Sequence, residues 1–298
     1  MSLLDRRLHV NIGKGGVGKT TVTAALALLL AQRGKRVLVA EVRAQNVPAI
    51  LGARGRGREI AQVAENLWAI ALEPKASMRE YALMRLHSKV LYRSIFENRL
   101  VASFLGFIPS LPELVMLGKV LHEVREGNWD AVVLDAPATG HGLTFLGVSR
   151  AVGQTIPAGP LRSETEWMQG LLEDPQATAI HLVAIPEELA VTETTELARA
   201  VRERLALPLG MLFLNRHVPE RFSDAELEAL SRGFAAPQLE AAADAARAHE
   251  DRARRSTRYE KQLRGLGLPL TTLPLLYPER AVGRREIETL AARIEAMA

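Results

Sequence analysis

Residues 11–22 read NIGKGGVGKTTV, and from Gly13 to Thr20 they fit the pattern G-x-x-x-x-G-K-[ST]. An apolar run precedes this stretch and a helix-length apolar run follows it, which is the strand–loop–helix context of a phosphate-binding loop. Glycines let such a loop curl until its N–H groups point at phosphate oxygens, and the following helix adds its positive end. The stretch therefore predicts a nucleotide site, which we expect to take ATP with Mg²⁺.

The polar side chains of this loop have distinct expected roles. Lys19 is expected to bridge the β- and γ-phosphates, the Thr20 hydroxyl to hold Mg²⁺, and Thr21 to lie near the α-phosphate. Asp135 ends an apolar strand, where a carboxylate can hold Mg²⁺ through water. The predicted nucleotide contacts in the loop are Gly13, Lys14, Gly15, Gly16, Val17, Gly18, Lys19, Thr20 and Thr21.

The composition excludes several classes of site. The 298-residue chain carries a formal net charge of +4 and contains no cysteine. Without thiols it cannot form disulfides, thiolate zinc sites or cysteine-held iron–sulfur clusters. No run approaches the roughly 20 apolar residues of a membrane-spanning helix, and the first residues lack the apolar core of a signal peptide. We therefore expect a cytoplasmic protein without a transmembrane segment.

Short apolar runs alternate with helix-length segments along the whole chain. The alternation predicts a doubly wound, mostly parallel α/β sheet with helices on both faces, in one domain over residues 1–298. A long, apolar helical crossover is expected at about residues 77–121, and a charged helical stretch at 223–265. The expected strands are 7–12, 36–42, 67–72, 131–137, 179–185, 209–215 and 268–276.

The loop contains a second lysine, Lys14. The pattern K-G-G-x-G-K-T-T resembles the deviant Walker loop of the SIMIBI-class P-loop ATPases, which include the Min and Par positioning ATPases and the nitrogenase iron protein. In that class the first lysine reaches across a two-fold interface to the partner's nucleotide, so the resemblance implies that Lys14 is a dimer residue. The alternative is a solvated lysine beside an anionic ligand.

A second motif narrows the resemblance to one family. Residues 132–143 read VVLDAPATGHGL, similar to the switch II stretch DTAPTGHT of the arsenite-pump and tail-anchored-protein targeting ATPases (the ArsA-like family). Thr139, Gly140 and His141 match in place. Where the family has Thr-Ala-Pro, however, this chain has Ala136, Pro137 and Ala138. Two interpretations of His141 stay open. It is a switch II residue, as the resemblance implies, or it is a histidine at a helix N-terminus whose ring forms hydrogen bonds with the backbone alone.

Further stretches resemble the same family in the same order. Residues 184–203 are similar to its IPE…ETxR helix, with Glu193 and Thr194 matching and Glu196 in the place of the arginine. The resemblance implies that Asn215 recognises adenine, since an amide offers both a donor and an acceptor to its edge. It also places Pro274 and Leu275 near the base. The alternative for Asn215 is a turn residue at a strand end.

The family couples ATP binding in a dimer or pseudo-dimer to the movement of a cargo, but the cargo does not transfer with the fold. Because this chain has no cysteine, thiol-bound arsenite and a cysteine zinc clasp are chemically unavailable. The apolar segment 77–121 could receive a protein client, although apolar helix faces usually pack against their own domain or a second subunit.

The family's switch I aspartate, which orients the attacking water, has no counterpart here. Counting forward from residues 34–36 places Arg43 at its position, and counting back from Asn46 places Val42 there. Glu41 is the nearest acid. We therefore expect a nucleotide-driven switch that hydrolyses ATP slowly or not at all when alone, unless Glu41 substitutes or Asp135 suffices.

Two other functions remain open. One is a non-hydrolysing regulatory subunit that forms a heterodimer with an active paralogue. The other is a positioning ATPase that binds DNA or membrane through arginines near residues 54–58 or 252–258. Acidic residues flank both arginine clusters, which favours solvated faces, so we expect no nucleic-acid partner.

Overall fold

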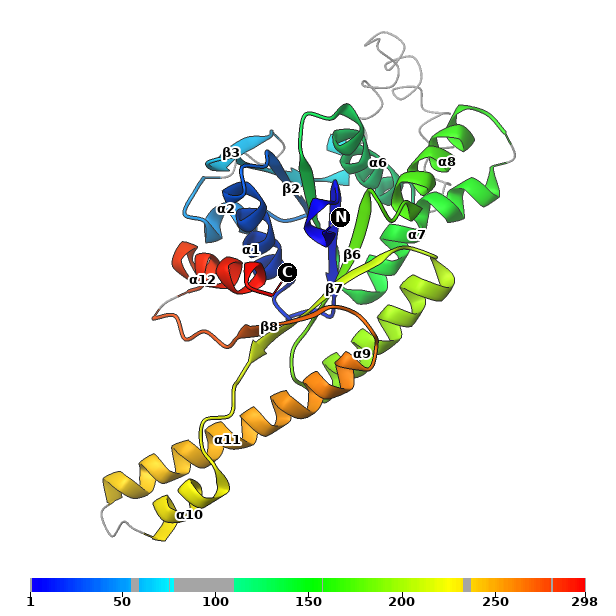
Figure 1. The fold of residues 1–298 in the computed structure, drawn as a ribbon. Coiled ribbons are helices and arrows are strands. Elements are labelled where there is room, and N and C mark those ends of the chain that lie inside the picture. The colour runs from blue at the N-terminus through cyan, green and yellow to red at the C-terminus, as the bar shows by residue number, and fades with distance from the viewer. Residues whose placement is uncertain are drawn as a thin grey trace.

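The computed structural model describes residues 2–54, 59–74, 76–77, 110–156, 158–232, 237–279 and 281–297. Its centre is a sheet of eight strands in the order β3-β4-β2-β5-β1-β6-β7-β8 (Figure 1). All neighbouring strands are parallel except β3 and β4. The strands are β1 (Leu8–Gly13), β2 (Val37–Val42), β3 (Ala61–Ala64), β4 (Leu67–Leu72), β5 (Ala131–Asp135), β6 (Thr178–Ala184), β7 (Leu209–His217) and β8 (Leu270–Pro274).

Helices cover both faces of this sheet (Figure 1). Side chains alternate between the faces along a strand, so β2 contributes Leu38 and Ala40 to one core, and Val37 and Val39 to the other. The first core contains residues of α6, α7, α8 and α9, and the second contains residues of α1 and α12. The helices are α1 (Lys19–Gln32), α2 (Asn46–Ile50), α6 (Leu111–Glu126), α7 (Thr139–Thr155), α8 (Pro160–Glu173), α9 (Glu188–Arg199), α10 (Asp224–Arg232), α11 (Pro237–Arg264) and α12 (Arg284–Glu295).

The predicted α/β class is confirmed, and each of the seven expected strands is present. β3 was not predicted, because AQVA is short and lacks a strong β pattern. Its pairing with β4 depends on the turn at Asn66, which adopts a positive φ of 55°. Most of the expected crossover at 77–121 lies outside the described residues, and the described part contributes α6.

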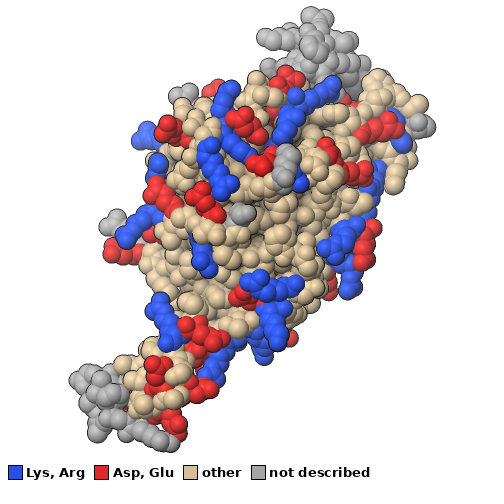
Figure 2. Space-filling model, viewed as in Figure 1, with Lys and Arg blue, Asp and Glu red and all other residues tan. Residues whose placement is uncertain are grey.

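The charged stretch at 223–265 forms α10 and α11, which project from the body of the domain as an arm (Figure 1). The buried side of α11 carries small residues such as Ala243, Ala246 and Ala253. Basic and acidic side chains are interleaved over the face drawn in Figure 2, so this view shows no extended surface of one sign. In the described part of the chain no helix, α11 included, combines the length and apolarity needed to cross a membrane.

Two histidines occupy the middle of the sheet. His9 on β1 and His181 on β6 are fully buried, and His9 Nδ1 lies 3.0 Å from His181 Nε2. The backbone N–H of Met211 donates to His181 Nδ1 over 2.9 Å, so in the neutral ring Nε2 carries the proton and donates to His9. Burial lowers the pKa of His9 to about 3 and also lowers that of His181 well below its usual value.

We expect both rings to remain neutral at pH 5 in the folded protein. The unfolded chain binds protons on both below pH 6.5, so the contribution of this pair to stability is present above that pH and is lost as the pH falls. At pH 5 the loss is about 2 kcal/mol per histidine. Histidine NMR signals followed from pH 7.5 to 5 check this, with His141→Gln used to assign an exposed ring. Ordinary titration of His9 and His181 near pH 6.5 would contradict the burial argument.

Candidate functional site

The loop between β1 and α1 has a backbone that requires its glycines. Gly16 and Gly18 adopt positive φ angles of 84° and 87°. A Cβ atom on Gly13 would lie 2.3 Å from the carbonyl oxygen of Val183 on the neighbouring strand, which no real side chain tolerates. Gly16 is exposed and such an atom there would meet nothing within 4 Å, so only its positive φ favours glycine. The N-terminal N–H groups of α1 face this region without a side-chain cap.

The two lysines of the loop have separate partners. Lys19 Nζ donates to the carbonyl oxygen of Lys14 over 3.0 Å, and Lys14 Nζ forms an ion pair with Glu193 Oε1 on α9 at 2.8 Å. Burial lowers the pKa of Lys19, and the Asp135 carboxylate opposes this shift. Lys19 is therefore a partly desolvated cation inside the loop, whereas Lys14 lies at its rim.

Asp135 lies at the end of β5 and is held by the threonines of α1. Thr20 Oγ1 donates to its Oδ2 over 2.6 Å, and Thr23 Oγ1 donates to its Oδ1 over 3.3 Å. Asn11 Nδ2 donates to Thr23 Oγ1 over 2.9 Å, and the Asn11 Oδ1 atom is buried without a partner in the described part of the chain. Burial raises the pKa of Asp135, and the hydrogen bond from Thr20 acts in the opposite direction.

Asn11 and Thr23 were not predicted as site residues. The available signal was a polar residue inside an apolar strand and another inside an apolar helix. The β-sheet register pairs Asn11 with Asp135, and Asp135 with Glu41 on β2. Paired residues on neighbouring strands point to the same face. These three polar side chains therefore form one row beneath α1 and the loop.

Glu41 is turned toward the start of α2. Its Oε1 accepts the backbone N–H of Asn46 over 2.8 Å, and both of its carboxylate oxygens lie 3.2 Å from the backbone nitrogen of Val47. The residue is 1% exposed. Burial raises its pKa to about 7, although the two N–H groups act in the opposite direction. Glu41 thus anchors the segment that follows β2.

The two residues expected at the position of the family's switch I aspartate differ in environment. Val42 is half-buried and packs on the α6 side of the sheet, away from the row that contains Asp135. Arg43 has a positive φ of 58°, and its guanidinium lies 3.3 Å from Glu113 Oε1 on α6. Neither residue supplies a carboxylate.

The donor set fits a magnesium ion. Thr20 and Asp135 bring a hydroxyl and a carboxylate oxygen within 2.6 Å of each other at the N-terminal end of α1. Hydroxyl, carboxylate and water oxygens are the ligands that Mg²⁺ takes beside nucleotide phosphates. When bound, the ion would neutralise negative charge on the phosphate oxygens.

Asn215, at the end of β7, contacts the loop from the other side. Its Nδ2 donates to the carbonyl oxygen of Val17 over 2.9 Å, and its Oδ1 accepts the N–H of Arg216 over 3.0 Å. A Cβ atom on Gly18 would lie 2.4 Å from Asn215 Nδ2. The amide therefore braces the loop, with one N–H and one lone pair left over for a ligand.

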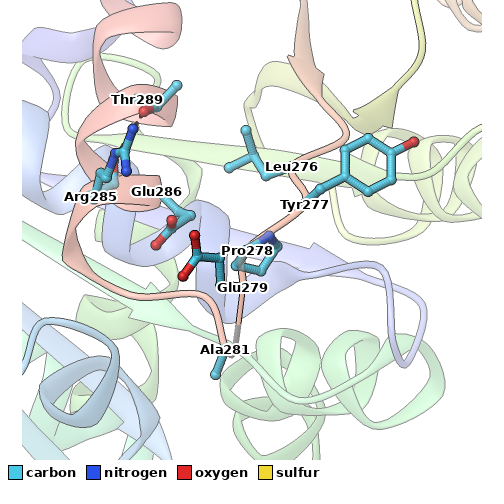
Figure 3. Close-up of a pocket in the computed structure, with 8 residues that line it drawn as sticks. All are labelled: Leu276, Tyr277, Pro278, Glu279, Ala281, Arg285, Glu286 and Thr289. Atoms are coloured by element: carbon cyan, nitrogen blue, oxygen red, sulfur yellow. Dashed lines mark hydrogen bonds between the residues drawn. The ribbon is translucent and has the colours of Figure 1, made fainter.

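The predicted adenine-side residues begin the connection from β8 to α12. Pro274 ends β8, and the N–H of Leu275 donates to the carbonyl oxygen of His217 over 2.9 Å. The connection next borders a cavity of about 500 Å³ (Figure 3). In this view Glu279 and Glu286 lie beside each other, and the exposed Tyr277 ring points away from them.

The remaining motif residues lie on two helices. His141 is exposed in the first turn of α7, and Gly140 precedes it; the Thr139 side chain lies outside the described set. On α9, Thr194 is buried and donates to the carbonyl oxygen of Ala190 over 2.7 Å. Glu196, which stands in the place of the family arginine, is exposed.

Comparison with known proteins identifies the family to which this chain belongs. The model of the anion-transporting ATPases matches residues 7–158, which include the loop, Glu41 and Asp135. The chain is similar to ATPase BagA of Mycobacterium tuberculosis, with 32% identity over 246 residues that cover 76% of this chain and 70% of that protein.

Two other relatives are matched over a shorter part of this chain. ATPase get3 of Schizosaccharomyces japonicus is 30% identical over 168 residues, which cover 53% of this chain and 51% of that protein. A putative arsenical pump-driving ATPase of Aquifex aeolicus is 30% identical over 148 residues, covering 47% of this chain and 37% of that protein. This chain accordingly belongs to the anion-transporting ATPase family and is an ATPase-type nucleotide-binding protein.

Proposed function

We propose that the chain binds ATP with Mg²⁺ and acts as a nucleotide-driven switch that associates with a second subunit, either its own copy or a paralogue. The contact between Thr20 and Asp135 at 2.6 Å supports this most directly, because it joins the phosphate loop to the strand end where a γ-phosphate would be sensed. Residues 13–21 would hold the phosphates, with Asn215, Pro274 and Leu275 on the side of the base.

The positions of the two lysines suggest how the switch works. Lys19 donates to a carbonyl oxygen of its own loop and can exchange that neutral acceptor for a charged phosphate oxygen. The Lys14–Glu193 ion pair is partly exposed, with side-chain exposures of 27% and 29%. Exposed ion pairs contribute only about 0–1 kcal/mol, so Lys14 can leave Glu193 for a partner's phosphate at little cost.

Lys14→Ala should weaken ATP-dependent association while changing ATP affinity only by a small factor. The lysine lies at the rim of the loop, where it would contact a partner's nucleotide rather than its own. Sedimentation velocity with a non-hydrolysable ATP analogue and Mg²⁺ measures the association, and calorimetry measures the affinity. Lys261→Ala, which removes an exposed lysine of α11, serves as the matched control. A strict monomer under every nucleotide condition, with no paralogue co-purifying, would refute the pairing.

We further propose that hydrolysis by the isolated chain is slow, so that the protein holds ATP rather than turning it over. The Val42 and Arg43 side chains have no oxygen that could accept a hydrogen bond or a proton from the attacking water, and the Glu41 carboxylate is occupied by the N–H groups of Asn46 and Val47. A client surface on residues 77–121 would complete the switch, but that segment lies largely outside the described residues.

A further inference from the structure

Asn11 is a buried amide in the middle of an apolar strand. It lies on β1 between Val10 and Ile12, and it is 0% exposed. Its Nδ2 donates to Thr23 Oγ1 on α1 over 2.9 Å, and Thr23 is also fully buried. The Oδ1 atom has no hydrogen-bond partner among the described residues. A buried amide with an unpaired acceptor is unfavourable for stability, so its presence here points to a use in the neighbouring site.

Thr23 stands between Asn11 and Asp135. Its hydroxyl accepts from Asn11 Nδ2 and lies 3.3 Å from Asp135 Oδ1. A threonine hydroxyl has one hydrogen and two lone pairs, so a hydroxyl that accepts from Asn11 keeps its hydrogen for Asp135. Thr20 Oγ1 donates to the other carboxylate oxygen over 2.6 Å. Both oxygens of Asp135 are therefore held by threonines of α1.

Other helical threonines of this chain use their hydroxyls differently. Each of the following donates to the carbonyl oxygen four residues earlier in its own helix: Thr144, Thr155, Thr192, Thr194, Thr195 and Thr289. Such a bond needs no partner from another element. In α1 it would join Thr23 to the carbonyl oxygen of Lys19, but the Thr23 hydroxyl bonds to Asn11 and Asp135 instead. The contrast indicates that Asn11 draws this hydroxyl away from its own helix.

The order of the strands gives Asn11 this position. The register pairs it with Asp135 on β5 and with His181 on β6. Both ring nitrogens of His181 already have partners, since Nδ1 accepts the N–H of Met211 and Nε2 lies 3.0 Å from His9 Nδ1. The hydrogen bond from Asn11 to Thr23 therefore acts on the side of the sheet where Asp135 lies.

We propose that Asn11 is a positioning residue for Mg²⁺: it directs the Thr23 hydroxyl to Asp135, so that the carboxylate is fixed before the ion binds. This inference rests on the proposed binding of ATP with Mg²⁺, and it adds two residues outside the phosphate-loop pattern. Thr20 and Asp135 would hold the ion, whereas Asn11 and Thr23 act through Asp135. Groups that orient metal ligands in this way contribute about 10- to 100-fold to metal affinity.

The test measures the affinity of the full chain for a non-hydrolysable ATP analogue, with and without Mg²⁺, by calorimetry. The ratio of the two dissociation constants reports the contribution of the ion. In Asn11→Leu, which keeps the approximate size of the side chain, this ratio should fall about tenfold or more, while the affinity without Mg²⁺ changes little. Thr23→Val should lower the ratio by a similar factor. The double variant should show no further loss, since both residues act through one hydrogen bond.

Two control variants make the test specific. Thr23→Ser keeps the hydroxyl and should retain the wild-type ratio. Thr178→Val removes another buried hydroxyl, which donates to the carbonyl oxygen of Leu171, and should also leave the ratio unchanged.

Thermal unfolding without nucleotide separates this role from a purely structural one. Leucine removes the unpaired acceptor, so Asn11→Leu should be about as stable as the wild type and still lose Mg²⁺ dependence. If Asn11→Leu does not fold, Thr23→Val gives the same test with a side chain of unchanged shape.

Two results would count against the inference in distinguishable ways. An unchanged ratio in the folded variants, with or without a loss of stability, would overturn it and leave the nucleotide site as proposed. A wild-type protein whose nucleotide affinity does not depend on Mg²⁺ would overturn the proposed function, and this inference with it.

Discussion

Lys19→Ala is expected to lower the affinity for ATP–Mg²⁺ on the order of 100-fold. The lysine is the cation of the loop, and its expected contacts to two phosphate groups are charge-assisted hydrogen bonds worth about 1.5–3 kcal/mol each. Its partial burial makes these contacts stronger than those of a surface lysine, since the groups have already lost part of their hydration. The substitution also leaves the Asp135 carboxylate without its nearby cation, which adds repulsion toward the phosphates.

Calorimetry on wild type, Lys19→Ala and Lys261→Ala measures this effect. The Lys261 control removes the same charge from the exposed face of α11, far from the loop in sequence. Thermal unfolding of each protein in the absence of nucleotide shows whether the loop variant keeps its fold. Equal ATP affinity in wild type and a folded Lys19→Ala protein would mean that the nucleotide site has been assigned to the wrong residues.

The isolated chain is expected to hydrolyse ATP at least two orders of magnitude more slowly than the roughly one turnover per second of an ordinary enzyme. An acid or amide that positions the water contributes about 10²–10⁴-fold to the rate, and neither Val42 nor Arg43, the residues expected at that position, is an acid or an amide. Glu41 lies in the row of Asp135, but its carboxylate is buried against the N–H groups at the start of α2.

Glu41→Gln tests the remaining possibility. Glutamine keeps an oxygen that accepts the N–H groups of Asn46 and Val47, so the fold of this segment should persist. It removes the negative charge and the ability to take a proton. Steady-state turnover near one per second by the wild-type protein would refute the proposal that the isolated chain hydrolyses ATP slowly. If that turnover disappeared in Glu41→Gln, the water-positioning role would belong to Glu41.

The sequence alone determined the class of fold and was enough to predict a phosphate loop. Both depend on patterns within a few residues: continuous apolar runs for strands covered on two faces, and glycines at fixed spacing for a loop that encloses an anion. The motifs around Lys14 and Asp135 were likewise sufficient to indicate the family. β3 escaped prediction because its four residues become a strand only when β4 lies beside them.

The tertiary structure decided how distant residues combine. The order of the strands brings Asn11, Asp135 and Glu41 into one row, and it directs Glu41 to the start of α2. The same order pairs Lys14 with Glu193 across the loop. The packing of α1 on β1 and β5 places the Thr23 hydroxyl between Asn11 and Asp135. No local pattern encodes these contacts, because each depends on which strands are neighbours and on which face of the sheet a side chain lies.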